Sequence, residues 1–171
     1  MLRVPTFECQ IWIDDLAVRY PAVSESVLDK IATELNQLAS EFDWAKIHAS
    51  ESSPGEERQY LLAQVGQDGL ALYLVSDGAG VSSAPHEHKT WAVIAGIRGI
   101  ENNIFYEVTS TESRDVCRHR SRHIGAGDYI ALTESVVHAT EVVGPGATFH
   151  LHLYGRPLHS LPPFQERVFR E

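Results

Sequence analysis

Two histidines separated by one residue form the most chemically suggestive pattern in this chain of 171 residues. They occur in the run Pro85-His86-Glu87-His88, which lies among residues typical of β-strands. Successive strand side chains point to opposite faces, so we expect His86 and His88 on one face and Glu87 on the other. The two imidazoles would lie about 7 Å apart along the strand and could converge on one metal ion. A lone histidine is more often an ordinary core or surface residue than a metal ligand. Whether His86 and His88 bind a metal therefore has to be judged from the surrounding sequence.

A second group of polar residues alternates with apolar ones in the run Phe149-His-Leu-His-Leu-Tyr154. One face of such a strand is apolar and suited to packing, and the other carries His150, His152 and Tyr154. In a small barrel the polar face is expected to line the cavity, because interior and exterior positions alternate. A buried tyrosine hydroxyl needs a partner, which His152 or a metal-bound ligand could supply.

These residues lie in a region of short β-rich runs separated by glycine turns. We expect strands at 58–65, 70–76, 84–88, 91–98, 103–110, 115–123, 128–132, 136–143 and 147–154. Many short strands at this spacing favour an antiparallel sandwich or barrel over alternating strands and helices.

The first 50 residues are predicted to be helical. Apolar residues recur at three- and four-residue intervals in Ser24–Phe42, and a shorter amphipathic helix is expected around Phe7–Tyr20. Ser24 or Ser26 can cap the longer helix. We therefore expect one domain over residues 1–171, with a helical segment (1–50) packed on a barrel (58–154) and an irregular tail (155–171).

Composition excludes several classes of protein. The chain has 14 Lys and Arg against 23 Asp and Glu, a net charge of −9, which argues against a nucleic-acid binder. No apolar run approaches the roughly 20 residues that span a bilayer, and the first residues do not resemble a signal peptide. Cys9 and Cys117 stand too far apart for a CxxC site or a disulfide framework. A cytoplasmic protein without membrane or nucleic-acid partners is expected, and its oligomeric state is left open.

The spacing around the histidine pair resembles the two sequence motifs of the cupins. Gly80, His86, His88 and Gly99 have the spacing of the first motif, and Gly127 and His138 have that of the second. Thr133 and Ser135 replace the usual Pro and Gly of the second motif. The resemblance covers about residues 58–154 and implies a mainly β fold, the cupin (double-stranded β-helix, jelly-roll) barrel, preceded by N-terminal helices.

One departure from the first motif bears on the metal. Many metal cupins carry a glutamate ligand where this chain has Ala92. A site of His86, His88 and His138 would therefore have three neutral ligands, keep the full charge of a dication and suit an incoming anion such as a thiolate or enolate. The alternative is that a carboxylate from elsewhere, Glu101 or Glu134, completes the site.

The chain further resembles the thiol dioxygenases, which comprise cysteine dioxygenase and its bacterial 3-mercaptopropionate dioxygenase relatives. The matching stretches are Pro85–Trp91, Ile97–Gly99, the isolated His138 and His152-Leu-Tyr154. The resemblance implies Fe(II) held by His86, His88 and His138, with His152 and Tyr154 as the pair that hydrogen-bonds substrate and oxygen species. It also implies O2-dependent oxidation of a small thiol to its sulfinic acid.

The chain departs from this family at three positions. His150 stands where the family usually has the serine of its Ser-His-Tyr set, and Ala92 replaces the cysteine that mammalian members cross-link to the tyrosine. Cysteine-specific members hold the substrate carboxylate with an arginine, and here Gln59 is placed at that position. Gln59 resembles the mercaptopropionate branch, whereas a shift of one residue would put Arg58 there and reverse the conclusion.

Two other functions remain open. Another three-histidine cupin dioxygenase, cleaving a carbon–carbon bond in a diketone-like substrate, would share the metal site without predicting the His-x-Tyr strand. A non-catalytic ligand-binding cupin would need no transition metal. The remaining histidines (His48, His119, His123, His159) are interpreted as incidental, and the basic strip Arg114–Arg122 as a solvated edge strand.

Overall fold

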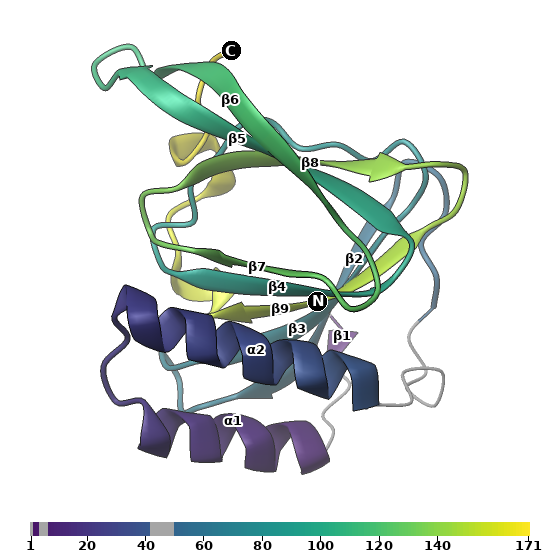
Figure 1. Ribbon diagram of the computed structural model, residues 1–171, viewed down its shortest axis with the longest axis vertical. Coiled ribbons are helices and arrows are strands. Elements are labelled where there is room, and N and C mark those ends of the chain that lie inside the picture. The colour runs from purple at the N-terminus through teal and green to yellow at the C-terminus, as the bar shows by residue number, and fades with distance from the viewer. Residues whose placement is uncertain (1, 4–6, 42–49) are drawn as a thin grey trace.

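Two helices cover one side of the protein, and nine strands make up most of the rest (Figure 1). The structure, a computed structural model, describes residues 2–3, 7–41 and 50–171. Helix α1 spans Phe7–Arg19 and α2 spans Glu25–Glu41, as predicted, while Phe42 and His48 lie outside the described residues. The N–H of Val27 donates to Ser24 Oγ at 3.4 Å, so Ser24 is the predicted cap.

The strands form two sheets that face each other. The bounds of the strands are β1 Leu2–Arg3, β2 Glu57–Gln64, β3 Ala71–Asp77, β4 Ala92–Arg98, β5 Ile100–Ser110, β6 Asp115–Ile124, β7 Tyr129–Leu132, β8 Val137–Val143 and β9 Thr148–Tyr154. Six of them form a sheet in the order β1-β2-β3-β9-β4-β7, and three form a sheet in the order β6-β5-β8. In Figure 1 the two sheets enclose the barrel, and α1 and α2 lie against the outside of the larger sheet.

The larger sheet has an apolar outer face and a partly polar inner face. On β9, Leu151 and Leu153 are fully buried in one core cluster with Ile31 and Leu35 of α2. Tyr154 of the same strand belongs to a second cluster, between the sheets. The alternation predicted for Phe149–Tyr154 is therefore confirmed, because adjacent strand residues pack on opposite sides.

Eight of the nine predicted strands are present, and the prediction of a strand over 84–88 is wrong. In that stretch only His86 makes bridge pairs, with His138 on β8 and with Val168. Pro85 has no N–H to donate to a ladder, and Lys89 has a φ of 58°, so regular pairing cannot extend in either direction. His86 and His88 therefore lie in a segment without regular strand pairing, residues 84–88, which is called the arm below.

The chain after β9 is irregular, as predicted, and it closes over the barrel. It contains two short 3₁₀ helices, η2 (Leu158–Ser160) and η3 (Phe164–Glu166). The N–H of Phe169 donates to the carbonyl of Pro85 at 2.8 Å, and that of Glu87 donates to the carbonyl of Arg167 at 3.1 Å. The tail thus holds the arm that carries the two histidines.

Of the helices within the described ranges, none combines the length and the apolar character that a membrane crossing requires.

Candidate metal centre

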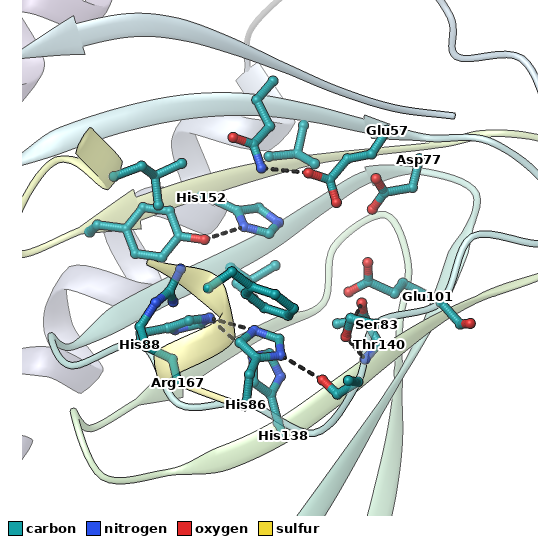
Figure 2. A pocket seen from close by; sticks show the side chains of 18 residues that line it. Glu57, Asp77, Ser83, His86, His88, Glu101, His138, Thr140, His152 and Arg167 are labelled. Carbon is teal, nitrogen blue, oxygen red and sulfur yellow. Dashed lines mark hydrogen bonds between the residues drawn. The ribbon is translucent and has the colours of Figure 1, made fainter. Parts of the chain in front are cut away.

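Residues from both sheets line a cavity of about 470 Å³ inside the barrel (Figure 2). This volume is in the range of small-molecule sites. The site residues predicted from the sequence that line it are His86, His88, His138, His152, Tyr154 and Gln59. The structure therefore brings the proposed ligands and the proposed hydrogen-bonding pair to one place.

The nitrogens of three buried histidines meet at one point in this cavity. His88 Nε2 lies 3.2 Å from His86 Nε2 and 3.2 Å from His138 Nε2. Two nitrogens that each lie about 2.1 Å from one ion, at right angles, are about 3.0 Å apart. The spacing of the three imidazoles therefore matches ligands on one face of a metal ion.

The hydrogen bonds of two of these rings fix which nitrogen is free. His86 Nδ1 lies 2.9 Å from the carbonyl oxygen of Ala84, and His138 Nδ1 lies 3.1 Å from Asn103 Oδ1. Both partners are acceptors, so each Nδ1 carries the proton and each Nε2 presents a lone pair. A proton on His88 Nε2 could satisfy only one of its two neighbours. A metal ion would satisfy all three lone pairs, so the donor set fits a metal.

Backbone pairing explains how the sequence produces this arrangement. His86 and His138 exchange both of their N–H···O=C hydrogen bonds, at 2.8 and 2.9 Å, so their side chains lie side by side. Glu87 points the other way, where Lys89 Nζ at 2.8 Å and Arg114 Nη2 at 3.1 Å pair with its carboxylate. The predicted division of faces holds even though the segment is not a strand.

Burial keeps the imidazoles neutral. It lowers the pKa of His86 to about 4, and together with the neighbouring histidines it holds the pKa of His88 and His138 well below the ordinary value. Neutral imidazole is the form that binds a metal ion. The three rings are therefore in the ligating state at neutral pH.

A hydrogen-bonded pair from β9 faces the three histidines. His152 Nδ1 lies 3.0 Å from the hydroxyl of Tyr154, and the rings of Tyr154 and His88 are 5.3 Å apart. Burial raises the pKa of Tyr154, so its hydroxyl keeps its proton. His152 Nε2 has no hydrogen-bond partner within the described part of the chain. The pair can therefore offer one donor and one acceptor to a molecule bound in the cavity.

The two candidate substrate-binding residues on β2 lie on different sides of that strand. Gln59 lines the cavity, and its Nε2 donates to Glu57 Oε1 at 2.6 Å. Arg58 is outside the cavity lining and pairs with Glu56 at 2.8 Å. Of the two registers considered, the structure places Gln59 at the cavity, because alternate strand residues face opposite ways.

His150 lies deeper in the barrel, in a second group of titratable side chains. It is fully buried beside Asp77 and Glu101, and the ligand atoms of the three lie within 4.8 Å of one another. Burial lowers the pKa of His150 to about 4, whereas burial and neighbouring carboxylates raise the pKa of Asp77 and Glu101. His150 therefore does not line the cavity as predicted.

Neither carboxylate considered as a fourth ligand joins the three histidines. Glu101 reaches them only through Asn103, whose Nδ2 donates to Glu101 Oε1 at 2.8 Å. Glu134 lines a different, shallower pocket beside α2. Among the described residues the histidine group consists of three neutral ligands.

The sequence interpretation missed three residues that bear on the site. Asn103 orients His138, Asp77 ends β3 at the cavity, and Arg167 is the only Lys or Arg among the residues that line it. Arg167 Nε donates to the carbonyl of Pro162 at 2.9 Å and Nη1 to that of Glu87 at 3.2 Å. Glu-x-Asn at 101–103, which puts two polar residues on the same face of β5, is a signal that could have pointed to an inward polar pair.

The features interpreted as incidental lie away from the cavity. β6 is an edge strand with exposed residues from Cys117 to His123, as predicted, and His159 is exposed. Arg114 is the exception in the basic strip, because it pairs with Glu87 and lies over the ring of Phe169 at 4.1 Å.

Comparison with known proteins supports the architecture. A scan against protein-family models and a search of curated proteins each found no match. Among solved structures, a cupin 2 conserved barrel domain protein from Leptotrichia buccalis matches with a TM-score of 0.50 and 18% identity, over 67% of this chain and 47% of that one. The fold is that of a cupin barrel. The predicted fold class is therefore confirmed.

Two further cupin-like structures show weaker similarity. A cupin superfamily protein from Desulfitobacterium hafniense has a TM-score of 0.47 and 17% identity, over 61% of this chain and 82% of that one. A DMSP lyase from Ruegeria pomeroyi has a TM-score of 0.45 and 22% identity, over 58% of this chain and 46% of that one. This chain therefore spans about half the length of two of the three structures. At such identity the likeness concerns the fold and leaves the reaction open.

Proposed function

We propose that this protein is an Fe(II)-dependent dioxygenase that oxidises a small thiol, such as cysteine or 3-mercaptopropionate, to its sulfinic acid. The observation that carries the proposal is a group of three neutral imidazoles, without a carboxylate ligand among the described residues, facing a His-x-Tyr pair in the barrel cavity. The resemblance of His86, His88, His138, His152 and Tyr154 to the thiol dioxygenase set supports the same reaction.

The charge of the ligand set favours an anionic substrate. Three neutral ligands leave the two positive charges of Fe(II) uncompensated, whereas a carboxylate ligand would already cancel one of them. A thiolate supplies that negative charge, and a nearby cation lowers the pKa of a thiol. When bound, Fe(II) would supply a centre at which the thiolate and O2 are held next to each other.

The reaction balances without another reactant. A thiol and O2 combine to give the sulfinic acid, with both oxygen atoms bonded to sulfur. The sulfur loses four electrons and O2 gains four, so no external reductant is needed. The protein has to bind the thiol, exclude water and supply hydrogen bonds at the reacting atoms.

Tyr154 and His152 are placed for the hydrogen bonds. His152 Nδ1 and the Tyr154 oxygen are 3.0 Å apart. If the Nδ1–H of His152 donates to that oxygen, the Tyr154 O–H is free to donate into the cavity. The raised pKa of the buried Tyr154 keeps this proton on the oxygen. Tyr154 is therefore proposed as a catalytic residue and His152 as its partner.

The other end of the substrate would meet Gln59 and Arg167. Gln59 supplies an amide from β2, and Arg167 supplies a positive charge from the tail. The guanidinium of Arg167 donates to the backbone carbonyls of Pro162 and Glu87, and these bonds hold the side chain along the cavity wall. An acidic group on the thiol substrate would be attracted to that charge.

Metal analysis and oxygen uptake test the proposal directly. We expect the iron-loaded protein to consume O2 with at least one of cysteine, 3-mercaptopropionate and cysteamine, and to give a product 32 mass units heavier than the thiol. His138→Ala should lose both iron and activity, whereas the exposed His123→Ala should keep both. Full iron in His138→Ala, or no uptake with any of the three thiols on an iron-loaded sample, would refute it.

The same assay separates the alternatives. A dioxygenase that cleaves carbon–carbon bonds would take up O2 with a β-diketone such as acetylacetone and not with the thiols. A non-catalytic ligand-binding cupin would contain no transition metal after purification in reducing buffer.

A further inference from the structure

We propose that the barrel contains a second metal site, in which Asp77, Glu101 and His150 bind a divalent transition-metal ion. These residues come from β3, β5 and β9, and the atoms that would bind the ion all lie within 4.8 Å of one another. The site shares no residue with the three-histidine group and does not depend on the thiol chemistry.

Burial and charge make the first argument for this site. Asp77 is 4% exposed, Glu101 is 1% exposed and His150 is 0% exposed. Among the described residues no Lys or Arg pairs with either carboxylate, and the only ion-pair partner within 4 Å is the uncharged His150. Buried carboxylates are normally paired with a cation or coordinate a metal, because removing them from water is costly.

Unpartnered atoms make a second, independent argument. Both ring nitrogens of His150 and Oδ1 of Asp77 are buried without a hydrogen bond of good geometry within the described ranges, although Asp77 and Glu101 contact each other and the backbone of Ile124 lies near His150. Buried polar atoms are almost always hydrogen-bonded, so this group has room for a further partner. The His150 ring is directed at the carboxylates, with Nδ1 3.9 Å from Glu101 Oε2.

The donor chemistry identifies the class of ion. Two ligands on opposite sides of an ion at about 2.1 Å lie about 4.2 Å apart, so a separation of 3.9 Å can be bridged by one ion. Two carboxylates and one imidazole suit Zn²⁺, Mn²⁺ or Fe²⁺, and their two negative charges cancel the charge of the ion. The site would therefore be electrically neutral, unlike the three-histidine site.

Hydrogen bonds connect the two sites. Glu101 Oε1 accepts from Asn103 Nδ2 at 2.8 Å, and Asn103 Oδ1 faces His138 Nδ1 at 3.1 Å. Glu101 thus uses one oxygen to orient the partner of His138 and keeps the other for the second ion. Because Glu101 serves both sites, Asp77 and His150 are the better positions for a test.

The test counts metal ions on the full chain. We expect the chelator-treated protein, saturated with Zn²⁺ and dialysed, to retain two equivalents per chain by elemental analysis. Asp77→Asn and His150→Gln should each retain one, His138→Ala should retain one, and the Asp77→Asn/His138→Ala double variant should retain none. Glu57→Gln removes a cavity carboxylate outside the group and should retain two.

The counts have clear contrary outcomes. One equivalent in the saturated wild type would overturn the second site and indicate that the two carboxyls share a proton instead. Two equivalents in both Asp77→Asn and His150→Gln would also overturn it, because the second ion would then be bound elsewhere. Thermal unfolding and gel filtration check that each variant is folded, and the wild-type count stands even if both variants unfold. Thiol oxidation depends on the three histidines and not on the second site. Loss or presence of this activity therefore tests the proposed function, whereas the metal count tests the second site.

Discussion

The two faces of the larger sheet use the same strands for opposite purposes. The outer face of β9 puts Leu151 and Leu153 against the helices, where nothing polar is needed. The inner face of the same strand puts His150, His152 and Tyr154 into the barrel, at a cost in desolvation. The outer face of β9 is therefore apolar, whereas the inner face of the sheet combines an apolar cluster with the polar residues of the site.

This division has a thermodynamic consequence. Apolar burial is non-directional, so the outer face can supply stability without fixing any side chain precisely. The polar inner residues need partners at set distances, and the rigid sheet positions them. Variants on the two faces should therefore separate stability from metal binding and activity.

The largest effect is expected from shortening a residue of the outer face. Leu151→Ala removes a fully buried side chain and should lower the free energy of unfolding by about 2–5 kcal/mol. Urea unfolding would measure this, with the exposed Val108→Ala as the control. If the folded fraction of Leu151→Ala bound less than half the normal iron, the two faces would not be independent.

Removing the tyrosine hydroxyl on the inner face should affect catalysis and little else. Tyr154→Phe is expected to lower the rate of thiol oxidation about a hundredfold, because a positioned donor at the reacting atoms is lost. Iron content and unfolding midpoint should stay close to wild type. Tyr106→Phe, which removes a hydroxyl bonded to Glu171, is the matched control. Unchanged activity in Tyr154→Phe would remove Tyr154 from the mechanism.

A smaller effect is expected at the residue that orients a ligand. Asn103→Ala removes the acceptor for His138 Nδ1–H and should weaken iron binding by about tenfold or more. Competition with a chromogenic chelator would measure the affinity. Asn102→Ala loses only a bond to Glu141 on the neighbouring strand and should bind iron normally. Equal affinities for the two variants would contradict a positioning role for Asn103.

The smallest effect concerns the helices that cover the outer face. Arg19 Nη2 donates to Glu34 Oε2 at 2.6 Å, and this bond lowers the pKa of Glu34 below its ordinary value of 4.5. A carboxyl whose pKa is lower in the folded protein than in the unfolded chain stabilises the fold at pH values above its pKa in the unfolded chain. This contribution disappears as the pH falls through its pKa in the folded protein. Because both side chains are partly exposed, Glu34→Gln should cost about 0.5 kcal/mol at pH 7.

Comparison of the unfolding free energies across pH would check this sign. The difference between wild type and Glu34→Gln should be largest above the ordinary carboxyl pKa of 4.5 and disappear as the pH falls through the lowered pKa of Glu34. Glu112→Gln, which removes an exposed carboxylate, serves as the control. A difference that grew with acidification would mean that the ion pair does not stabilise the fold.

Much of the fold could be predicted from the sequence because it depends on local pattern. Strand alternation separates Leu151 from His152, and helical spacing identifies the buried stripe of α2. The grouping of His138 with the distant His86 and His88 came instead from the resemblance to the two cupin motifs, because no local periodicity links positions so far apart.

The rest depends on tertiary pairing that one sequence does not contain. Nothing local shows that Val168 pairs with His86, or that Arg167 returns to the cavity. The strand expected at 84–88 failed because its hydrogen bonds are made with β8 and the tail instead of a regular ladder. His150 was placed in the cavity by alternation alone, whereas Asp77 and Glu101 enclose it in the barrel.

The contact between the arm and the tail also affects how the protein is made. The segment that presents His86 and His88 is held by residues 167–169, which follow all nine strands in the chain. During synthesis the barrel strands leave the ribosome first, and the arm lacks its final partner until the tail arrives. The arm that presents His86 and His88 therefore gains its backbone bonds to Arg167 and Phe169 only after all nine strands have been made.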